Sequence, residues 1–204
     1  MEERTVPTGV ALRDVRDQLF NAAERVLLRA GPSGLTSRAV TSEAGCAKGV
    51  LHRHFADFDA FLAELVLDRV GRIEAQAVAL LDRTGTGTVA GNLTAALTGV
   101  FESVAVAIVG LITFRDELRA RLRRTRPAGV PLLAEATAMI ASYLAAEVEM
   151  GRIAVDADVD TLALTLVGAA HLLYAGREGS PPDPAAVEKV VTTVIADVLQ
   201  RRLL

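Results

Sequence analysis

The sequence predicts an all-α protein in which a small amino-terminal head of three helices precedes a larger helical body. Apolar residues recur every three or four positions through most of the 204 residues, and no run alternates with the period of two that marks a strand. With 51% hydrophobic residues, the chain can bury a substantial core. We assign residues 12–56 to the head and residues 57–204 to the body.

The head is predicted from three amphipathic segments separated by stop signals. The first has apolar residues at helical spacing from Val15 to Leu27 and stops at the run 30–32, Ala-Gly-Pro. In the second, Thr36 offers its side-chain oxygen to the free amides of a short helix that ends before Gly45. A third short helix is expected from Ala47 to about Phe55.

The body begins with a long helix that Asp57 can cap, with an apolar series that continues towards Leu80. After a Thr/Gly loop at 84–88, one apolar helix is expected over residues 89–113. The Arg-rich run 115–126 follows; we interpret it as a solvated helix face rather than a second nucleic-acid patch or a site for an anionic ligand.

Three further helices complete the expected body. They cover about 131–150, about 158–175, and a last segment that ends near Arg202. The loop GREGSPPD precedes the last helix, and its Asp183 with the following Pro184 makes a good cap and first turn.

Composition and termini predict a cytoplasmic protein that does not enter a membrane. The amino-terminal MEERTVPTGV is acidic and polar, unlike a secretory signal, and a single cysteine excludes an internal disulfide framework. The longest uncharged stretch, Ser103 to Phe114, falls well short of the roughly 20 residues that span a bilayer. Residues 1–55 carry eight basic against six acidic side chains, whereas the rest is acidic. A mildly basic head is compatible with a polyanionic partner.

The stretch GCAKGVLHRHF at 45–55 contains two histidines, two basic residues and the only cysteine, but its geometry argues against a metal or catalytic site. On a helix His52 and His54 point about 200° apart, so they cannot ligate one metal ion. Cys46 falls in the tight turn, where a small buried residue is usual, and no acid is placed to orient a histidine. We therefore expect no catalytic residue, no metal and no cofactor, and the protein is not expected to be an enzyme.

The same stretch suits helix-turn-helix DNA binding. Leu51 and Phe55 share the face that enters the core, and the opposite face can enter the major groove. Gly49 lets the helix approach the base edges closely, and Val50 can contact a thymine methyl. The remaining polar side chains can reach bases or phosphates, with the start of the second helix suited to a phosphate. The candidate DNA-binding residues are Thr36, Ser37, Arg38, Lys48, Gly49, Val50, His52, Arg53 and His54.

The run LTSRAVTSEAGCAKGVLHRHFADFDAFLAEL at 35–65 resembles the DNA-binding head of the TetR family of bacterial transcriptional regulators. The matching positions are Thr36, Arg38, Val40, Glu43, Ala44, Gly45, Lys48, Gly49, Leu51, His54, Phe55 and Leu62. Four positions depart from the family pattern: Thr41, Ala47, His52 and Phe58. Phe58 stands where a phosphate-contacting lysine is frequent, and Ala47 where a serine often caps the recognition helix.

The resemblance implies a body that binds an effector and forms a homodimer through the last two helices, so that two heads read a near-palindromic operator in double-stranded DNA. The apolar stripes expected to form that dimer are Leu162, Leu166, Ala169, Ala170 and Leu173, together with Val187, Val190, Val191, Val194, Ile195 and Val198. The alternative for either stripe is that it covers the core of its own chain. The effector is expected to be a small, mostly apolar molecule. Its candidate residues are Phe101, Val104, Ile108, Phe114, Met139, Tyr143, His171 and Tyr174.

The predicted function is a sequence-specific DNA-binding regulator, a repressor released when the effector shifts the two heads away from the groove spacing. Two alternatives stay open. The first is a helical small-molecule-binding protein that has lost DNA binding, which Ala47 and Phe58 motivate. The second is a small helical enzyme using His171 and Tyr174, for which the sequence offers no acid-base constellation.

Overall fold

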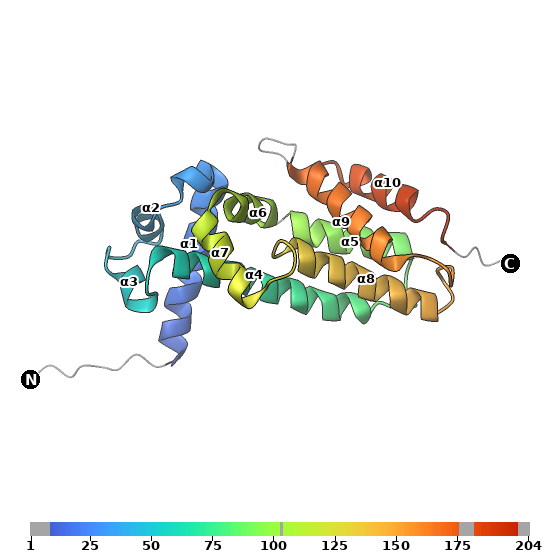
Figure 1. Ribbon diagram of the computed structural model, residues 1–204, viewed down its shortest axis with the longest axis horizontal. Coiled ribbons are helices and arrows are strands. Elements are labelled where there is room, and N and C mark those ends of the chain that lie inside the picture. The colour runs from blue at the N-terminus through green and yellow to red at the C-terminus, as the bar shows by residue number, and fades with distance from the viewer. Residues whose placement is uncertain (1–8, 103, 176–181, 200–204) are drawn as a thin grey trace, which may run out of the picture.

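The computed structural model describes residues 9–102, 104–175 and 182–199, and these form helices joined by turns (Figure 1). The all-α prediction is confirmed: the described residues contain one isolated β-bridge, Ile153 with Leu199, and no strand. The helices are α1 (Gly9–Gly34), α2 (Ser37–Glu43), α3 (Val50–His54), α4 (Phe58–Leu81), α5 (Val89–Phe101), α6 (Ala105–Phe114), α7 (Asp116–Thr125), α8 (Leu133–Glu149), α9 (Val159–Ala175) and α10 (Pro184–Val194).

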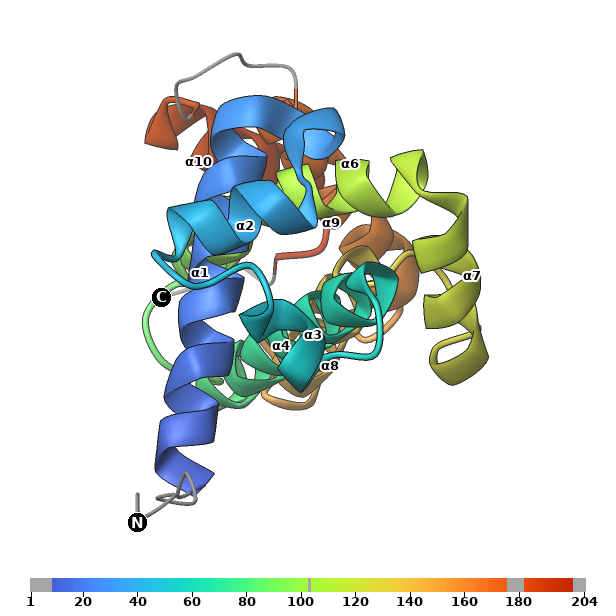
Figure 2. The ribbon, with the colours of Figure 1, turned by 90° about the vertical axis from the view of Figure 1, so that its left-hand side faces the viewer.

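The helices form a small head and a longer bundle that share α4 (Figure 1). Helices α1, α2 and α3 lie at one end, where α2 and α3 are nearest the viewer in the end-on view (Figure 2). Helix α4 leaves the head and packs along α8, while α9 and α10 cover α5 on the other side of the bundle. Helices α6 and α7 bridge the two parts, since α6 packs against α1 and α7 against α4.

Aromatic packing holds the head together. The rings of Phe20 on α1 and Phe55 after α3 lie 5.9 Å apart, and Phe61 on α4 lies 5.6 Å from Phe20. Phe55 meets Phe61 edge to face at 5.0 Å, a favourable arrangement of aromatic quadrupoles. The Arg16 guanidinium lies 4.6 Å from the centre of the Phe55 ring and pairs with Glu64 on α4. The recognition segment is therefore seated on a rigid base.

The predicted helix boundaries in the head are confirmed except at α3. Regular helix in α1 is interrupted at Gly31, whose φ of 66° lies in the left-handed region, as the predicted stop requires. Thr36 and Asp57 cap α2 and α4 as expected. Helix α3 begins at Val50 rather than Ala47, because the turn after α2 uses residues up to Gly49.

The single apolar helix predicted over 89–113 was wrong: the structure divides it into α5 and α6, bent by 52°. Both segments are apolar on most sides, so periodicity gives no sign of the break. The bend lets α5 pack against α9 and α10 while α6 turns to contact α1. No single helix of the described residues is long and apolar enough to cross a bilayer, although α5 and α6 together have the required length and composition.

The last helix ends at Val194, well before the predicted end near Arg202; residues 176–181 of the preceding loop and 200–204 lie outside the described residues. Helix α10 stops because the chain turns back towards the loop after α8. The amide of Ala154 donates to the Val198 carbonyl at 2.8 Å, and Ile153 pairs with Leu199. These contacts come from a segment distant in sequence, which helix propensity does not reveal.

A cluster of buried polar side chains connects helices and a loop at the far end of the body. The Asn92 side-chain amide donates to the Tyr143 hydroxyl at 2.9 Å and to the Thr86 carbonyl at 2.9 Å. Burial, with a contribution from Glu147, raises the pKa of Tyr143 to about 12. The Glu147 carboxylate is fully buried and pairs with Arg152 at 3.4 Å. Because each buried polar group needs a partner, this cluster specifies how α5 and α8 meet the loop after α4.

Candidate nucleic-acid interface

The start of α2 is held by local hydrogen bonds. The Thr36 hydroxyl oxygen accepts from the Ala39 amide at 3.1 Å, which satisfies one of the free amides of the helix. Thr41 is buried on the core side, and its hydroxyl donates to the Ser37 carbonyl at 3.0 Å. Thr36 and Arg38 are exposed, and Ser37 is half-buried. The first turn of α2 thus presents a hydroxyl, an arginine and backbone amides outward.

The turn between α2 and α3 is a Schellman motif centred on Gly45. The Cys46 amide donates to the Thr41 carbonyl at 2.9 Å, and the Gly45 amide donates to the Ser42 carbonyl at 3.2 Å. Gly45 has a φ of 65°, a conformation that glycine adopts without steric cost. The Gln18 side-chain amide on α1 donates to the Ala44 carbonyl at 2.7 Å. The turn is therefore fixed both locally and against α1.

Helix α3 presents two sides of different character. Leu51 and Phe55 are buried, as predicted, while His52 and Arg53 are exposed. Lys48 and Gly49 are also exposed but lie in the turn that leads into α3 rather than within it. The other two predicted residues, Val50 and His54, are half-buried, and Val50 packs partly against the core. Only part of the Val50 side chain is left to meet a base.

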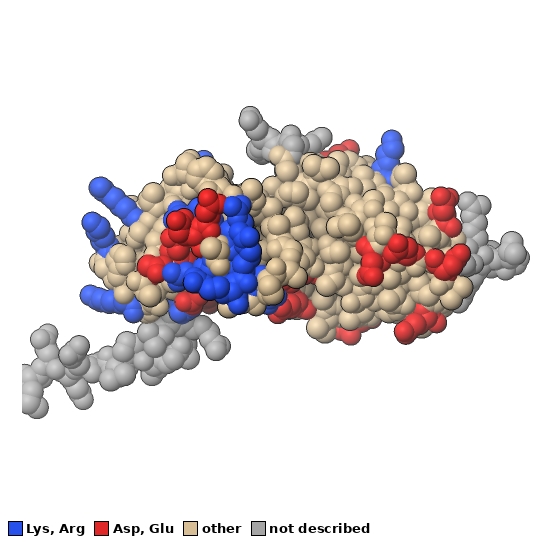
Figure 3. Space-filling model, viewed as in Figure 1, with Lys and Arg blue, Asp and Glu red and all other residues tan. Residues whose placement is uncertain are grey.

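Charged groups in the head fall into two classes. Arg25 and Arg29 of α1 both pair with Glu43 at the end of α2, at 2.7 and 2.9 Å. The hydrogen bonds from Arg25 and then Arg29 hold the pKa of the Glu43 carboxyl below its ordinary value. By contrast, no ion pair forms at Arg38, Lys48 or Arg53 with any residue that the structure describes. Basic side chains project from the end of the molecule that carries α2 and α3 (Figure 3).

The sequence-predicted DNA-binding residues thus come together on α2, the turn and α3 at the tip of the head. The residues that position them, Gln18, Arg25 and Arg29, were not predicted. Their signal was available: each lies on α1 next to an apolar position, and Glu43 supplies a matching charge. Phe58, which departs from the family pattern, stacks on Phe61 at 5.7 Å and serves packing.

The Arg-rich run forms α7, and several of its arginines are engaged in ion pairs rather than only solvated. Arg115 pairs with Asp59 at 2.9 Å and Arg121 with Asp57 at 2.8 Å, both at the start of α4. Arg126 pairs with two acids, Glu74 and Glu135. The interpretation as a solvated face holds for the exposed Arg123 and Arg124. It is corrected for Arg115, Arg121 and Arg126, which attach the run to the helix that leaves the head.

The candidate effector residues do not gather around one cavity. Phe101, Ile108, Met139 and Tyr143 are buried in the core, and Tyr174 is half-buried with its ring 5.9 Å from that of Phe101. Val104 is also buried and lines a cavity of about 290 Å³ between head and body. Phe114, which is exposed, and His171 line an open hollow between α6 and α9. Burial lowers the pKa of His171.

The two apolar stripes expected at a dimer surface mostly face their own core. Leu166 and Ala170 of α9 are buried, as are Val187 and Val191 of α10 and Ile195, which directly follows α10. The exposed apolar side chains on α9 are instead Leu164 and Leu172, which are 65% and 73% exposed. Between them lies Gly168, where an added Cβ would meet open space.

Comparison with known proteins agrees with this architecture. Residues 19–65 match the family model described as bacterial regulatory proteins, tetR family. None of the curated proteins compared with the chain matches it in sequence.

Three solved structures illustrate the likeness of fold. A TetR-family transcriptional regulator from Agrobacterium tumefaciens has 13% sequence identity and a TM-score of 0.70, covering 93% of this chain and 100% of its own. The regulator FadR from Bacillus subtilis, in complex with stearoyl-CoA, has 16% identity and a TM-score of 0.68, covering 89% and 98%. A transcriptional regulator from Rhodococcus sp. has 21% identity and a TM-score of 0.65, covering 90% and 95%.

Proposed function

We propose that this chain, which carries the amino-terminal domain of the tetR family of regulatory proteins on the fold of TetR-family regulators, represses transcription from a near-palindromic operator. It binds that operator as a homodimer, and a small ligand releases it. The DNA-binding residues are the nine predicted from the sequence, of which six are exposed: Thr36, Arg38, Lys48, Gly49, His52 and Arg53.

The observation that carries this proposal is the contrast between paired and unpaired cations in the head. Arg25 and Arg29 are neutralised by Glu43, whereas the described residues include no ion-pair partner for Arg38, Lys48 or Arg53. Unpaired, exposed cations beside a helix-turn-helix are free to displace counterions from phosphates. Affinity for DNA gained in this way falls steeply with salt.

A first experiment selects sheared source-genome DNA on the full-length protein at about physiological salt. Wild type is expected to enrich a small set of near-palindromic fragments. The double variant Lys48→Ala with Arg53→Ala is expected to lose that enrichment. On an enriched fragment, the slope of log affinity against log salt should fall by about 0.9 for each phosphate contact removed.

The matched control is Arg83→Ala with Arg124→Ala, which removes the same charge from exposed positions of the body and of α7. This control should bind the fragment like wild type. If both double variants weaken binding equally, net charge rather than the head accounts for it. If wild type enriches nothing even at several-fold lower salt, the proposal of DNA binding fails and a ligand-binding protein without an operator takes its place.

The release by a ligand is supported by the fold and by the position of the cavity. FadR from Bacillus subtilis has been solved with stearoyl-CoA, so a body of this fold can hold a ligand. In this chain the cavity of about 290 Å³ is lined by residues of α1 in the head and of α4, α5 and α6. A molecule bound there would touch both parts, as a shift of head position requires.

A further inference from the structure

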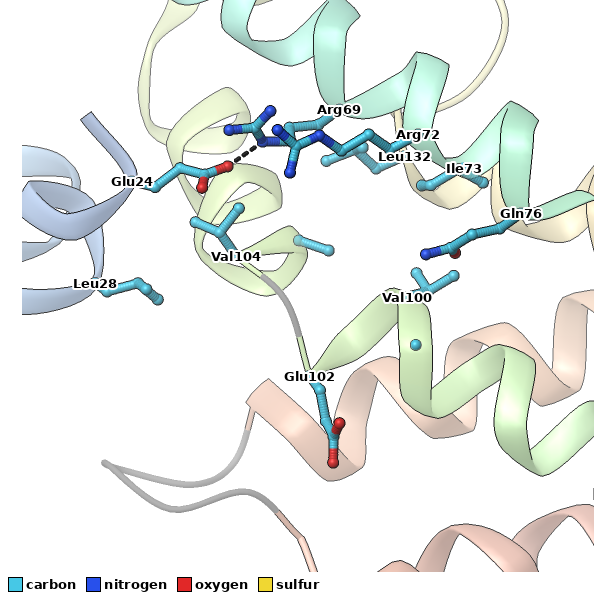
Figure 4. Close-up of a pocket in the computed structure, with 12 residues that line it drawn as sticks. Glu24, Leu28, Arg69, Arg72, Ile73, Gln76, Val100, Glu102, Val104 and Leu132 are labelled. Carbon is cyan, nitrogen blue, oxygen red and sulfur yellow. Dashed lines mark hydrogen bonds and ion pairs between the residues drawn. The ribbon is translucent and has the colours of Figure 1, made fainter. Parts of the chain in front are cut away.

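The cavity at the junction of head and body is lined by both apolar and charged side chains, with Glu24, Arg69 and Arg72 on one side and Glu102 on the opposite side (Figure 4). Its volume of about 290 Å³ lies just below the range for small-molecule sites, which begins near 300 Å³. Leu28 reaches it from α1, Ile73 from α4, and Val104 and Leu132 from the segments that start α6 and α8. Arg69 and Glu24 meet on its charged side (Figure 4).

Arg69 is the residue that most needs explanation. It occupies a core position of α4, four residues after Leu65 and four before Ile73, and its side chain is only 6% exposed. Its Nε donates to Glu24 and its Nη1 to Asp68. Its Nη2 is buried and has no acceptor among the residues that the structure describes. A buried donor without an acceptor is unfavourable, so this atom marks a place for an oxygen from a ligand or a water molecule.

The charges around the cavity decide what kind of oxygen fits. Arg69 and Arg72 carry two positive charges, and Glu24 and Asp68, which pair with them, carry two negative charges. These four charges sum to zero; Arg69 is buried, whereas the Arg72 side chain is 61% exposed. The exposed Glu102 adds a negative charge at the cavity. An anionic ligand would be repelled by this excess, while an ammonium group offers no acceptor to Nη2.

We propose that the cavity binds a small uncharged molecule whose carbonyl oxygen accepts a hydrogen bond from Arg69 Nη2 and whose apolar part packs on Leu28, Ile73 and Val104. This ligand would be the effector that releases the DNA. That regulatory role rests on the proposed function, whereas the binding itself does not. Because the Arg69–Glu24 pair joins α4 to α1, a ligand on Arg69 acts on the contact that orients the head.

The test uses the full-length protein and four probes of nearly equal size. Benzylacetone and hydrocinnamamide carry an uncharged carbonyl, hydrocinnamate carries a carboxylate, and butylbenzene has no acceptor. Dissociation constants are measured by ligand-observed NMR. Both carbonyl probes are expected to bind at least about tenfold more tightly than the other two, the difference that one hydrogen bond to a charged donor gives.

Two variants localise the binding. Arg69→Lys keeps a positive charge beside Glu24 but removes Nη2, and it should weaken the carbonyl probes about tenfold or more while leaving butylbenzene unchanged. Gly99→Leu fills the cavity without touching Arg69; an added Cβ there meets only the end of Gln76, at 3.9 Å. The matched control is Gly71→Leu, on the exposed side of α4, where an added Cβ meets open space. Circular dichroism checks that each variant is folded.

The possible results distinguish ligand binding in the cavity from regulation of DNA binding. Equal binding of butylbenzene and benzylacetone, or binding that survives Gly99→Leu, would overturn the site. Failure of both carbonyl probes to bind would also overturn the proposed site, and a water molecule would then be the partner of Arg69 Nη2. If the probes bind as expected but do not lower the affinity of the protein for an enriched DNA fragment, the cavity is a ligand site. It is then not the site of the effector that releases DNA. If the protein enriches no DNA but the carbonyl probes bind as expected, the proposed function as a DNA-binding regulator is refuted, and the proposed ligand site in the cavity stands.

Discussion

Individual charged residues in the head have distinct tasks that depend on their partners. Arg25 and Arg29 are held by Glu43 and join α1 to the end of α2. Arg53 of α3 and Lys48 in the turn before it carry the same charge, but they are exposed and have no ion pair in the described chain. Charge alone therefore does not identify a DNA contact, and the neighbouring acid decides the role.

Glu43→Gln is expected to lower the free energy of unfolding at neutral pH, because it removes the charge that both arginines bind. The folded-state pKa of Glu43 lies below its ordinary value, so its contribution is present above that value and is lost as the pH falls through the lowered pKa. The difference between wild type and variant should be measurable at about pH 7 and smaller at about pH 3, below the ordinary pKa of a glutamate. Chemical denaturation followed by circular dichroism measures both.

The control for this prediction is Glu149→Gln, at an exposed position at the end of α8. It is not expected to reproduce the pH-dependent loss. A Glu43→Gln penalty of equal size at both pH values would mean that the ion pairs with Arg25 and Arg29 do not stabilise the head.

At the level of elements, α2, its turn and α3 are shaped by interactions within a few residues. Thr36 caps α2, the Schellman hydrogen bonds close it, and Asp57 caps α4 by accepting from the Ala60 amide at 2.6 Å. Two glycines in this segment have different roles. Gly45 lies at positive φ, whereas Gly49 has a φ of −80° that any residue can adopt.

Gly45→Ala is expected to affect stability, and Gly49→Ala is expected to affect DNA binding. Alanine at Gly45 should lower the free energy of unfolding by about 1 to 2 kcal/mol, the cost of placing a Cβ in the left-handed region. Alanine at Gly49 should leave stability unchanged, since an added Cβ meets open space there, but it should weaken operator binding by standing between helix and base edges. Denaturant unfolding and fluorescence anisotropy on an enriched fragment measure the two effects. Loss of stability in both variants would contradict this division.

At the level of the whole molecule, two heads must be joined at a fixed separation to read two half-sites. Part of the apolar stripe of α10 is covered by its own chain: Val187 and Val191 are buried, whereas Val190 and Val194 are half-buried. On α9, Leu164, Gly168 and Leu172 recur at every fourth position and are exposed. A glycine between two leucines lets a second helix approach closely, which favours pairing of α9 with its copy.

Leu164→Glu combined with Leu172→Glu is expected to convert a dimer into a monomer of 21.5 kDa, because like charges would meet across the twofold axis. Light scattering after gel filtration measures the mass. Operator affinity should fall in parallel, since one head reads one half-site. The control is Val78→Glu with Val155→Glu, two exposed apolar positions elsewhere, which should stay dimeric. A monomeric wild type would contradict the proposed assembly.

The sequence by itself determined the all-helical class, the head and the exposed face of its recognition segment. These depend on spacing and on caps such as Thr36, Gly45 and Asp57, whose hydrogen bonds close within a few residues. It also placed α8 and α9 to within a few residues, because each has a clear polar boundary.

Only the tertiary structure decided where α5 gives way to α6, where α10 ends, and which apolar stripe is buried. Each depends on a partner distant in sequence: α1 for α6, Ala154 for the end of α10, and α5 for the stripe of α10. The same holds for the cavity at Arg69. The sequence placed a charge at a core position of α4, but Glu24, 45 residues away, and the unpartnered Nη2 appear only when head and body pack together.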